Sequence, residues 1–187
     1  FFLAIILLTM KQGMGQEQSE ITEEELKLYQ LIMDYRKSEG LPEIPLSKSL
    51  TYVAQVHCRD LADNKPDLKS GCNAHSWSDK GEWTACCYTR DHKQAECMWN
   101  KPKELTNYPG YGFEIAGGSS DPRYKGFVMT AQYALESWQK SYHHNNVILN
   151  KDIWADSEWK AIGIGIYKGF TTVWFGKEED PEGEVQY

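Results

Sequence analysis

The segment 73–78 contains the residues whose types and spacing most clearly suit chemistry. It reads Asn-Ala-His-Ser-Trp-Ser, and so places the imidazole of His75 beside two hydroxyl groups and an indole. Gly71 and Gly81 flank the segment, which is typical of a loop. Loops on a rigid scaffold often carry functional side chains, and an imidazole titrates near neutrality, which suits metal binding or proton transfer. We therefore expect a functional loop around His75, with an ordinary surface histidine as the alternative.

Two other parts of the chain offer groups that could act with His75. Glu114 is a carboxylate among apolar neighbours, and such a group must be paired, protonated or bound if it is buried. An exposed sheet edge is the alternative for Glu114. His143 and His144 lie at the end of a helix expected at 130–142, where the helix dipole favours charged histidines. Only the fold could bring His144 next to His75, because the two are far apart in the sequence.

The helices that must position these groups follow from the spacing of apolar residues. Apolar residues three and four positions apart predict helices at 22–39, 47–63 and 130–142. His57 lies on the apolar stripe of the second helix, and that face is needed for packing. The pattern therefore predicts a packed, hydrogen-bonded core histidine at this position rather than a ligand.

A β-hairpin is expected near the end of the chain. Alternation in 161–167, a two-residue turn and a second apolar run at 171–176 predict two antiparallel strands. Gly163 and Gly165 share one face of the first strand, which lets another backbone or a ligand come close.

Length and charge restrict the class of protein. A chain of 187 residues fits one domain with a core of its own. The net charge is −7 and no basic block stands out, so a nucleic acid is not an expected partner. The final segment, 177–187, is rich in acids and is expected to be a solvated tail.

The start of the chain predicts secretion. Its apolar run is too short to cross a bilayer as a helix. Segment 1–16 is instead typical of a secretory signal, with a membrane anchor or a buried N-terminal strand as the alternative. We expect a secreted, extracellular protein with no stable membrane span in its mature form.

The cysteines fit the same environment. None is spaced as Cys-x-x-Cys, so a zinc ribbon is not indicated. In a secreted chain they predict disulfides, which would order the long irregular region 66–109. The adjacent pair is expected to bond outward, one thiol is left over, and the connectivity stays open. The candidates are Cys58, Cys72, Cys86, Cys87 and Cys97.

The order of these features resembles the CAP superfamily, the domain of cysteine-rich secretory proteins, antigen 5 and pathogenesis-related protein 1, and especially its bacterial SCP-like branch. The resemblance covers about 22–176, within a single domain expected at 17–176 that carries a cysteine-rich insert at about 66–109. It implies an α+β fold, a three-layer α-β-α sandwich with a central antiparallel sheet. The matching pieces are the helix 50–62 with Ala54-Gln55, His75-Ser76, the run 111–116, Trp138-x-x-Ser141-x-x-His144, and Ile-Gly-Ile-Gly-Ile at 162–166.

The family cleft holds two histidines and two glutamates, and in some members a divalent metal. By resemblance His75 matches the first histidine and His144 the second, with His143 as its nearest rival. Glu114 stands one place later than the family pattern, so either a local bulge restores it or Phe113 occupies that position. Ser141 stands where the second glutamate is expected.

The resemblance implies a binding domain that takes a ligand or partner in this cleft. Zn²⁺ or another divalent metal would be bound by His75, His144 and Glu114. The partner would be an unknown protein or a small lipid or sterol. The sequence offers no convincing nucleophile, which argues against an enzyme. The alternatives are a divalent-metal-dependent hydrolase that uses the same three residues, and a sterol or fatty-acid binding protein. The cleft would also include Ser76, Trp77, Ser141 and His143.

Overall fold

The computed structural model describes residues 20–187, so the expected secretory signal at 1–16 lies outside the described residues. The first helix, α1 (Glu23–Ser38), begins with a capping box in which Thr22 and Glu25 satisfy each other's backbone amides. The second, α2 (Lys48–Asn64), begins where the Ser47 hydroxyl accepts a hydrogen bond from the amide of Leu50 at 2.9 Å. The helices expected at 22–39 and 47–63 are confirmed.

The sheet has three antiparallel strands, β1 (Gly112–Gly117), β2 (Ala161–Tyr167) and β3 (Phe170–Gly176), in the order β1-β3-β2. The expected hairpin is β2 and β3. Its two-residue turn places Lys168 at φ 44° and Gly169 at φ 87°, the left-handed pair that matches the twist of the flanking strands.

The helix expected at 130–142 is wrong in its extent, because two helices occupy this part of the chain. They are α5 (Ala131–Lys140) and α6 (Tyr142–Ile148). The chain turns between them at Ser141, whose ψ of 114° is extended. No glycine or proline marks this break. His143 and His144 therefore lie in the first turn of α6, at the N-terminal end of a helix and not at the C-terminal end that we expected.

The remaining helical segments are short. They lie in the irregular region and in the connections on either side of α5 and α6. The elements are η1 (Pro66–Leu68), α3 (Ala95–Trp99), α4 (Lys101–Leu105), η2 (Pro122–Tyr124) and η3 (Asp152–Trp154). Among residues 20–187, no helix is both long and apolar enough to cross a bilayer.

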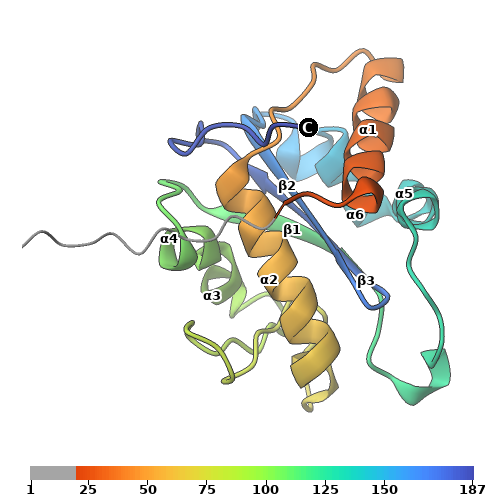
Figure 1. Ribbon diagram of the computed structural model, residues 1–187, viewed down its shortest axis with the longest axis vertical. Helices are drawn as coiled ribbons and strands as arrows, with labels where there is room; N and C mark the ends of the chain where they lie inside the picture. The colour runs from red at the N-terminus through yellow and green to blue at the C-terminus, as the bar shows by residue number, and fades with distance from the viewer. Residues whose placement is uncertain (1–19) are drawn as a thin grey trace, which may run out of the picture.

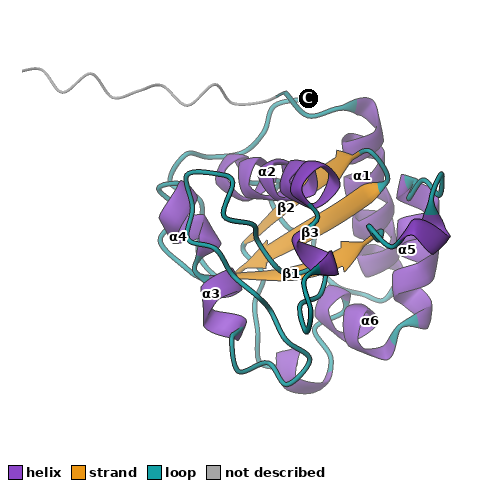
Figure 2. Cartoon of the chain, turned by 90° about the horizontal axis from the view of Figure 1, so that it is seen from below, coloured by secondary structure: helices purple, strands orange, loops and turns teal. Residues whose placement is uncertain are grey.

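The elements form three layers, as the resemblance implies. One face of the sheet, with Ile164 and Val173, packs with α1, α5 and α6 in the larger core cluster. The other face, with Trp174, packs against α2. Figures 1 and 2 show the sheet between α2 on one side and α1, α5 and α6 on the other.

The approach of α2 to the sheet depends on glycine. A Cβ at Gly163 would lie 2.0 Å from the main-chain carbon of Leu50, and one at Gly165 would lie 2.3 Å from that of Ala54. The backbone of α2 thus rests directly on β2, as the alternation of glycines in this strand predicted.

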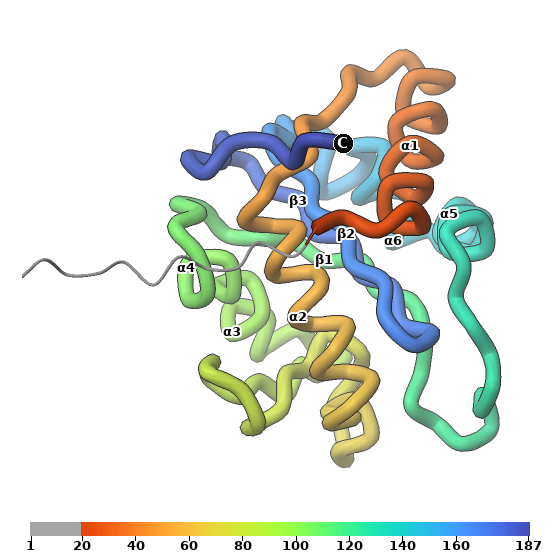
Figure 3. The backbone as a smooth tube through the Cα atoms, viewed as in Figure 1, coloured from red at the N-terminus to blue at the C-terminus, as the bar shows by residue number. Residues whose placement is uncertain are grey.

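The acidic C-terminal segment is exposed over most of its length, as expected, but it is not a free tail. Its backbone pairs with the start of α2, where Val185 donates to Leu46 at 2.8 Å and Gly183 accepts from Lys48 at 3.1 Å. Asp180 accepts from the amide of Ser49 at 2.8 Å, so a carboxylate caps the positive end of the α2 dipole. Figure 3 shows this segment running back beside α2.

Two disulfides link the irregular region. They join Cys72 to Cys87 and Cys86 to Cys97, so the adjacent cysteines bond outward as expected. Cys58, on α2, is a buried free thiol.

Replacing Gly163 by Ala should lower the free energy of unfolding by roughly 1–3 kcal/mol, the usual cost of overpacking. The new methyl group would overlap the main chain of α2, which cannot move aside as a side chain can. Urea unfolding followed by circular dichroism measures the change. A loss below about 0.5 kcal/mol, typical of an unconstrained surface site, would show that α2 lies farther from β2.

Thiol titration tests the disulfides. The protein unfolded without reductant should show one reactive thiol per chain, that of Cys58. Prior reduction should raise this number to five. Three or more thiols without reductant would contradict one or both bonds.

Candidate functional site

A chain of hydrogen bonds joins two histidines through one carboxylate. His57 Nδ1 lies 2.5 Å from Glu114 Oε1, and His75 Nδ1 lies 2.7 Å from Glu114 Oε2. The other ring nitrogen of His57 lies 3.0 Å from the backbone oxygen of Ser76. The side chains of His57 and Glu114 are fully buried, whereas 21% of the His75 side chain is exposed. Glu114 is therefore paired on both oxygens, and His75 is the member that reaches solvent.

The register of β1 with β3 determines which side chain of β1 faces this site. Glu114 lies opposite Trp174 in the register with β3, on the face covered by α2. Phe113 points to the other face, where its ring lies 5.0 Å from that of Trp154 and 5.7 Å from that of Trp159. Glu114, and not Phe113, therefore supplies the carboxylate.

The position of His57 was predicted, but its partner was not. As expected, it is a packed core histidine: its ring stacks on Trp77 with centroids 4.2 Å apart. Nothing in the sequence links it to Glu114, because the pair forms only when α2 lies on the sheet. The one available signal was an ionisable residue on the most apolar stripe of a helix, which requires a buried partner.

The charge state of the pair follows from its geometry. Both ring nitrogens of His57 face acceptors, and only an imidazolium can donate from both. Burial by itself lowers the pKa of His57, but the carboxylate of Glu114 outweighs it and raises that pKa. Burial likewise favours the neutral form of Glu114, yet the charges and hydrogen bonds of His57 and His75 lower the pKa of its carboxyl. The pair is therefore a buried imidazolium and a carboxylate.

The hydroxyl groups of Ser76 and Ser78, beside His75, form hydrogen bonds that fix the conformation of the loop. Ser76 is fully buried, and its oxygen accepts from the amides of Asn73 at 3.2 Å and Tyr88 at 2.9 Å. The Ser78 hydroxyl donates to Asp60 on α2 at 2.5 Å. Trp77, also buried, pairs with Cys86 as an isolated bridge. These contacts fix the loop, and neither serine is placed as a nucleophile.

His144 is the histidine of α6 on whose ring the charge of His75 acts. It is partly buried, and its ring lies 6.4 Å from that of Trp138, whose indole donates to Ala116 on β1 at 3.3 Å. Burial lowers the pKa of His144 to about 4, and the charges of His75 and His143 add to the effect. This low pKa favours a neutral His144 ring near pH 7, whereas a histidine held at a helix end by the dipole, which was the alternative to a ligand, would be charged.

His143 and Ser141, which were also expected at this site, make no hydrogen bond to His75 or Glu114 among the described residues. His143 is exposed, with its ring edge-on to Tyr142 at 5.4 Å. Ser141 forms the junction between α5 and α6. Of the two histidines considered for the second position, His143 is thus exposed and His144 partly buried.

The donor set does not fit the three-ligand metal site that we expected. Both oxygens of Glu114 already accept hydrogen bonds from imidazoles. Among residues 20–187, no three His, Cys, Asp or Glu side chains are grouped to hold a metal ion. Two imidazoles remain: His75, whose Nδ1 is held by Glu114, and the neutral His144. Glu114 occupies the position of a carboxylate that orients a ligating histidine.

Comparison with known proteins supports the fold. No protein-family model matches this sequence, and no curated protein does. Solved structures do match. An extracellular protein containing an SCP domain from Bacillus anthracis is 18% identical with a TM-score of 0.55, and the match covers 83% of this chain but 40% of that one.

Two further structures agree. An outer surface protein from Borrelia burgdorferi is 17% identical with a TM-score of 0.53, covering 87% of this chain and 99% of that one. A cysteine-rich secretory protein from Staphylococcus aureus is 13% identical with a TM-score of 0.50, covering 83% and 39%. The chain thus has the fold of SCP-domain structures, and the resemblance stated from the sequence is confirmed for the fold.

Replacing Glu114 by Gln should lower the free energy of unfolding by about 3–5 kcal/mol near neutral pH, because it leaves a buried imidazolium without its partner. Folding lowers the pKa of this carboxyl. Its contribution is therefore present above its unfolded pKa of about 4.3 and is lost as the pH falls through the lower folded value. The difference between the parent and Glu114→Gln should therefore shrink as the pH falls below about 4.3.

Urea unfolding at several pH values measures this difference, with the exposed Glu82→Gln as the matched control. The control should differ little from the parent throughout. An unchanged gap between the parent and Glu114→Gln in acid would show that Glu114 is not ionised in the folded protein.

Proposed function

We propose that this protein is an extracellular binding domain that engages its ligand or partner through His75 and His144. The single observation that carries the proposal is the bond between His75 Nδ1 and Glu114, at 2.7 Å. It fixes the ring and leaves Nε2 as the ring nitrogen for a ligand. Two disulfides support an extracellular location. So do the descriptions of the similar structures as extracellular, outer-surface or secretory proteins.

The proposal includes a divalent metal ion, such as Zn²⁺, held by the two imidazoles. Imidazole nitrogen is a preferred zinc donor when neutral, and the low pKa of His144 keeps that ring neutral. Glu114 would orient His75 rather than coordinate the ion. Because two protein ligands leave coordination positions open, the ion would supply a point of attachment for an acidic group of the partner.

A second candidate function is hydrolysis. An imidazole oriented by a buried carboxylate is also the arrangement of a general base. The engaged hydroxyls of Ser76 and Ser78 offer no nucleophile, so such a reaction would use water. No observation among the described residues favours the sterol or fatty-acid alternative over these two functions.

Calorimetry with Zn²⁺ tests the proposal. The parent should bind one ion per chain, and His75→Ala or His144→Ala should abolish binding. Glu114→Gln should weaken it by about 10–100-fold, the usual effect of removing an orienting partner. Binding should also weaken in acid, because a ligating imidazole must be free of its second proton.

His92→Ala is the matched control, because His92 is exposed and outside the site. Unchanged affinity in either His75→Ala or His144→Ala would reject a metal shared by the two histidines. Turnover of a peptide or ester that stops when a chelator is added would establish the hydrolase instead of the binding domain.

A further inference from the structure

The two edges of the sheet differ in how their main-chain groups are used. β2 forms one edge, where the amide of Ile162 donates to Pro45 at 3.0 Å and its oxygen accepts from Ser47 at 2.8 Å. β1 forms the other edge, which Figure 2 shows at the margin of the sheet. A strand edge with unpaired main-chain groups is able to pair with another chain.

The main-chain groups of Glu114 point away from β3. In an antiparallel ladder, alternate residues direct both groups to the partner strand and the residues between them direct both groups outward. Ala116 is an outward residue, because its oxygen accepts from the indole of Trp138 on α5 at 3.3 Å. Glu114 lies two positions earlier in the same strand and is therefore outward as well.

The pairing of β3 with β2 leads to the same result. Since Ile162 directs its groups to segment 45–47, its neighbour Gly163 directs its own to Trp174. The main-chain groups of Trp174 are thus used on the β2 side and cannot also bond to Glu114, which lies opposite on the other side.

The main chain of Glu114 is also open to solvent. The residue is 8% exposed although its side chain is fully buried, so the exposed surface belongs to the main chain. Ala116 is partly exposed. Within residues 20–187, nothing bonds to the amide or oxygen of Glu114 or to the amide of Ala116. The edge thus presents two donors and one acceptor.

The side chains on the two faces of this edge indicate what kind of segment fits. On the α2 face is His75, whose partly exposed imidazole suits a carboxylate. On the opposite face is the half-buried ring of Phe113, with centroids 5.6 Å from Trp99 and 5.0 Å from Trp154. A strand added here would place alternate side chains on these two faces.

We propose that the β1 edge binds an extended peptide segment of the partner as an added antiparallel strand. This inference deepens the proposed function, because it specifies the chemistry of the partner at the same site. Glu114 would exchange two main-chain hydrogen bonds with the peptide residue opposite it, and the amide of Ala116 would donate a third. That peptide residue would be acidic and meet His75, and its two neighbours would be apolar and meet the face of Phe113.

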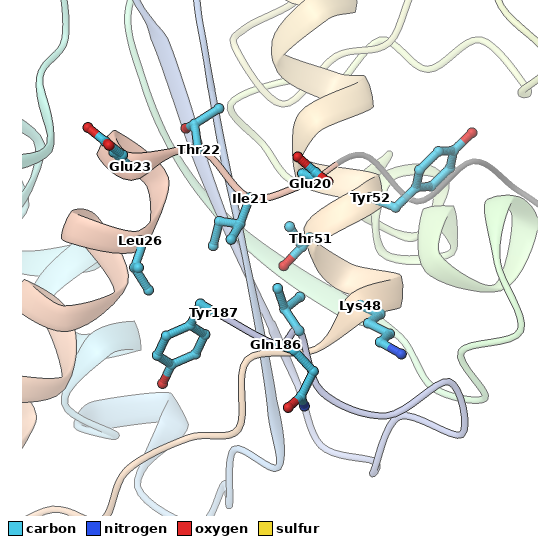
Figure 4. A pocket seen from close by; sticks show the side chains of 11 residues that line it. Glu20, Ile21, Thr22, Glu23, Leu26, Lys48, Thr51, Tyr52, Gln186 and Tyr187 are labelled. Carbon is cyan, nitrogen blue, oxygen red and sulfur yellow. The ribbon is translucent and has the colours of Figure 1, made fainter.

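The pocket between α1, α2 and the C-terminal segment, about 560 Å³ in volume, is a separate feature. Figure 4 shows Ile21 and Tyr187 beside it, and no residue of β1 lines it. The charged groups of Lys48 and Glu23 point outward (Figure 4), so they do not select a ligand inside it. The pocket therefore provides a control position for peptide binding.

Amide hydrogen exchange tests the proposal, with the full chain, a chelator and the peptide acetyl-Thr-Val-Glu-Val-Thr-amide. In the free protein, the amides of Glu114 and Ala116 should exchange quickly and that of Ile115, which bonds to β3, slowly. The peptide is used at millimolar concentration because three neutral hydrogen bonds give weak binding. It should slow exchange at Glu114 and Ala116 by roughly tenfold when in roughly tenfold excess over its Kd.

Methylated peptides distinguish strand pairing from other modes of binding. Methylating the amide of the central glutamate should abolish the protection, because that amide would donate to Glu114. Methylating the amides of the two valines, which would point away from β1, should leave the protection unchanged. Replacing the glutamate by glutamine should weaken binding roughly tenfold in the parent but not in His75→Ala.

A variant of the edge provides a second measurement. Ala116→Pro removes one donor but no bond to β3, and proline is tolerated on an edge strand. It should therefore keep the circular dichroism spectrum of the parent and weaken the peptide roughly tenfold. Ile21→Ala, in the pocket of Figure 4, should leave peptide binding unchanged.

The proposal is overturned if the peptide does not slow exchange at Glu114 and Ala116, or if methylating the valines also abolishes the effect. Protection of these amides in the free protein that rises with its concentration would place a second copy at the edge, and would overturn it too. The chelator keeps this test separate from the zinc titration. Protection without zinc binding would support strand pairing and reject the shared metal, and zinc binding without protection would do the reverse.

Discussion

The structure depends on one buried anion. Glu114 lies in the interior, where an ionised carboxylate is strongly unfavourable unless charge and hydrogen bonds compensate it. The compensation comes from two imidazoles that belong to different segments, His57 on α2 and His75 on the loop that follows it. Glu114 on β1 therefore joins α2, through His57, to the loop, through His75. Removing any one of the three side chains would leave a buried charge or hydrogen-bonding group without its partner. The same interaction positions the only solvent-reaching member of the group.

The irregular region is ordered by contacts that differ from those of the sandwich. Two disulfides cross-link it through adjacent cysteines, and the hydroxyls of the serines beside His75 bond to backbone amides of the loop and to the carboxylate of Asp60. The ring of Trp77 fills the space under the loop and stacks on His57. An exposed loop of this length would have many conformations. Here the residues next to His75 are bonded to α2, Ser76 to His57 and Ser78 to Asp60. The helix therefore helps to fix the position of His75.

Sequence reasoning succeeded where structure is decided locally. The apolar periodicity of α1 and α2 and the alternation of β2 and β3 are local patterns, and those elements lie where they were expected. The break at Ser141 was missed because no glycine or proline marks it. Family resemblance proposed His75, Glu114 and His144 as site residues, but it did not propose the pairing of Glu114 with His57, which arises only from tertiary packing. The composition of the acidic end of the chain correctly indicated solvation, but it could not show that Asp180 meets the start of α2.

The glycines of β2 have a mechanical consequence. Because Gly163 and Gly165 let the main chain of α2 touch the strand, the helix has neighbouring ridges on either side of these contacts and cannot slide along its axis without collision. The close contact thus fixes the position of α2 on the hairpin, and with it the place of His57 beside β1. The segments that carry His75 and His144 have no such contact with the main chain of β2, so side-chain changes there would not displace α2 from the sheet.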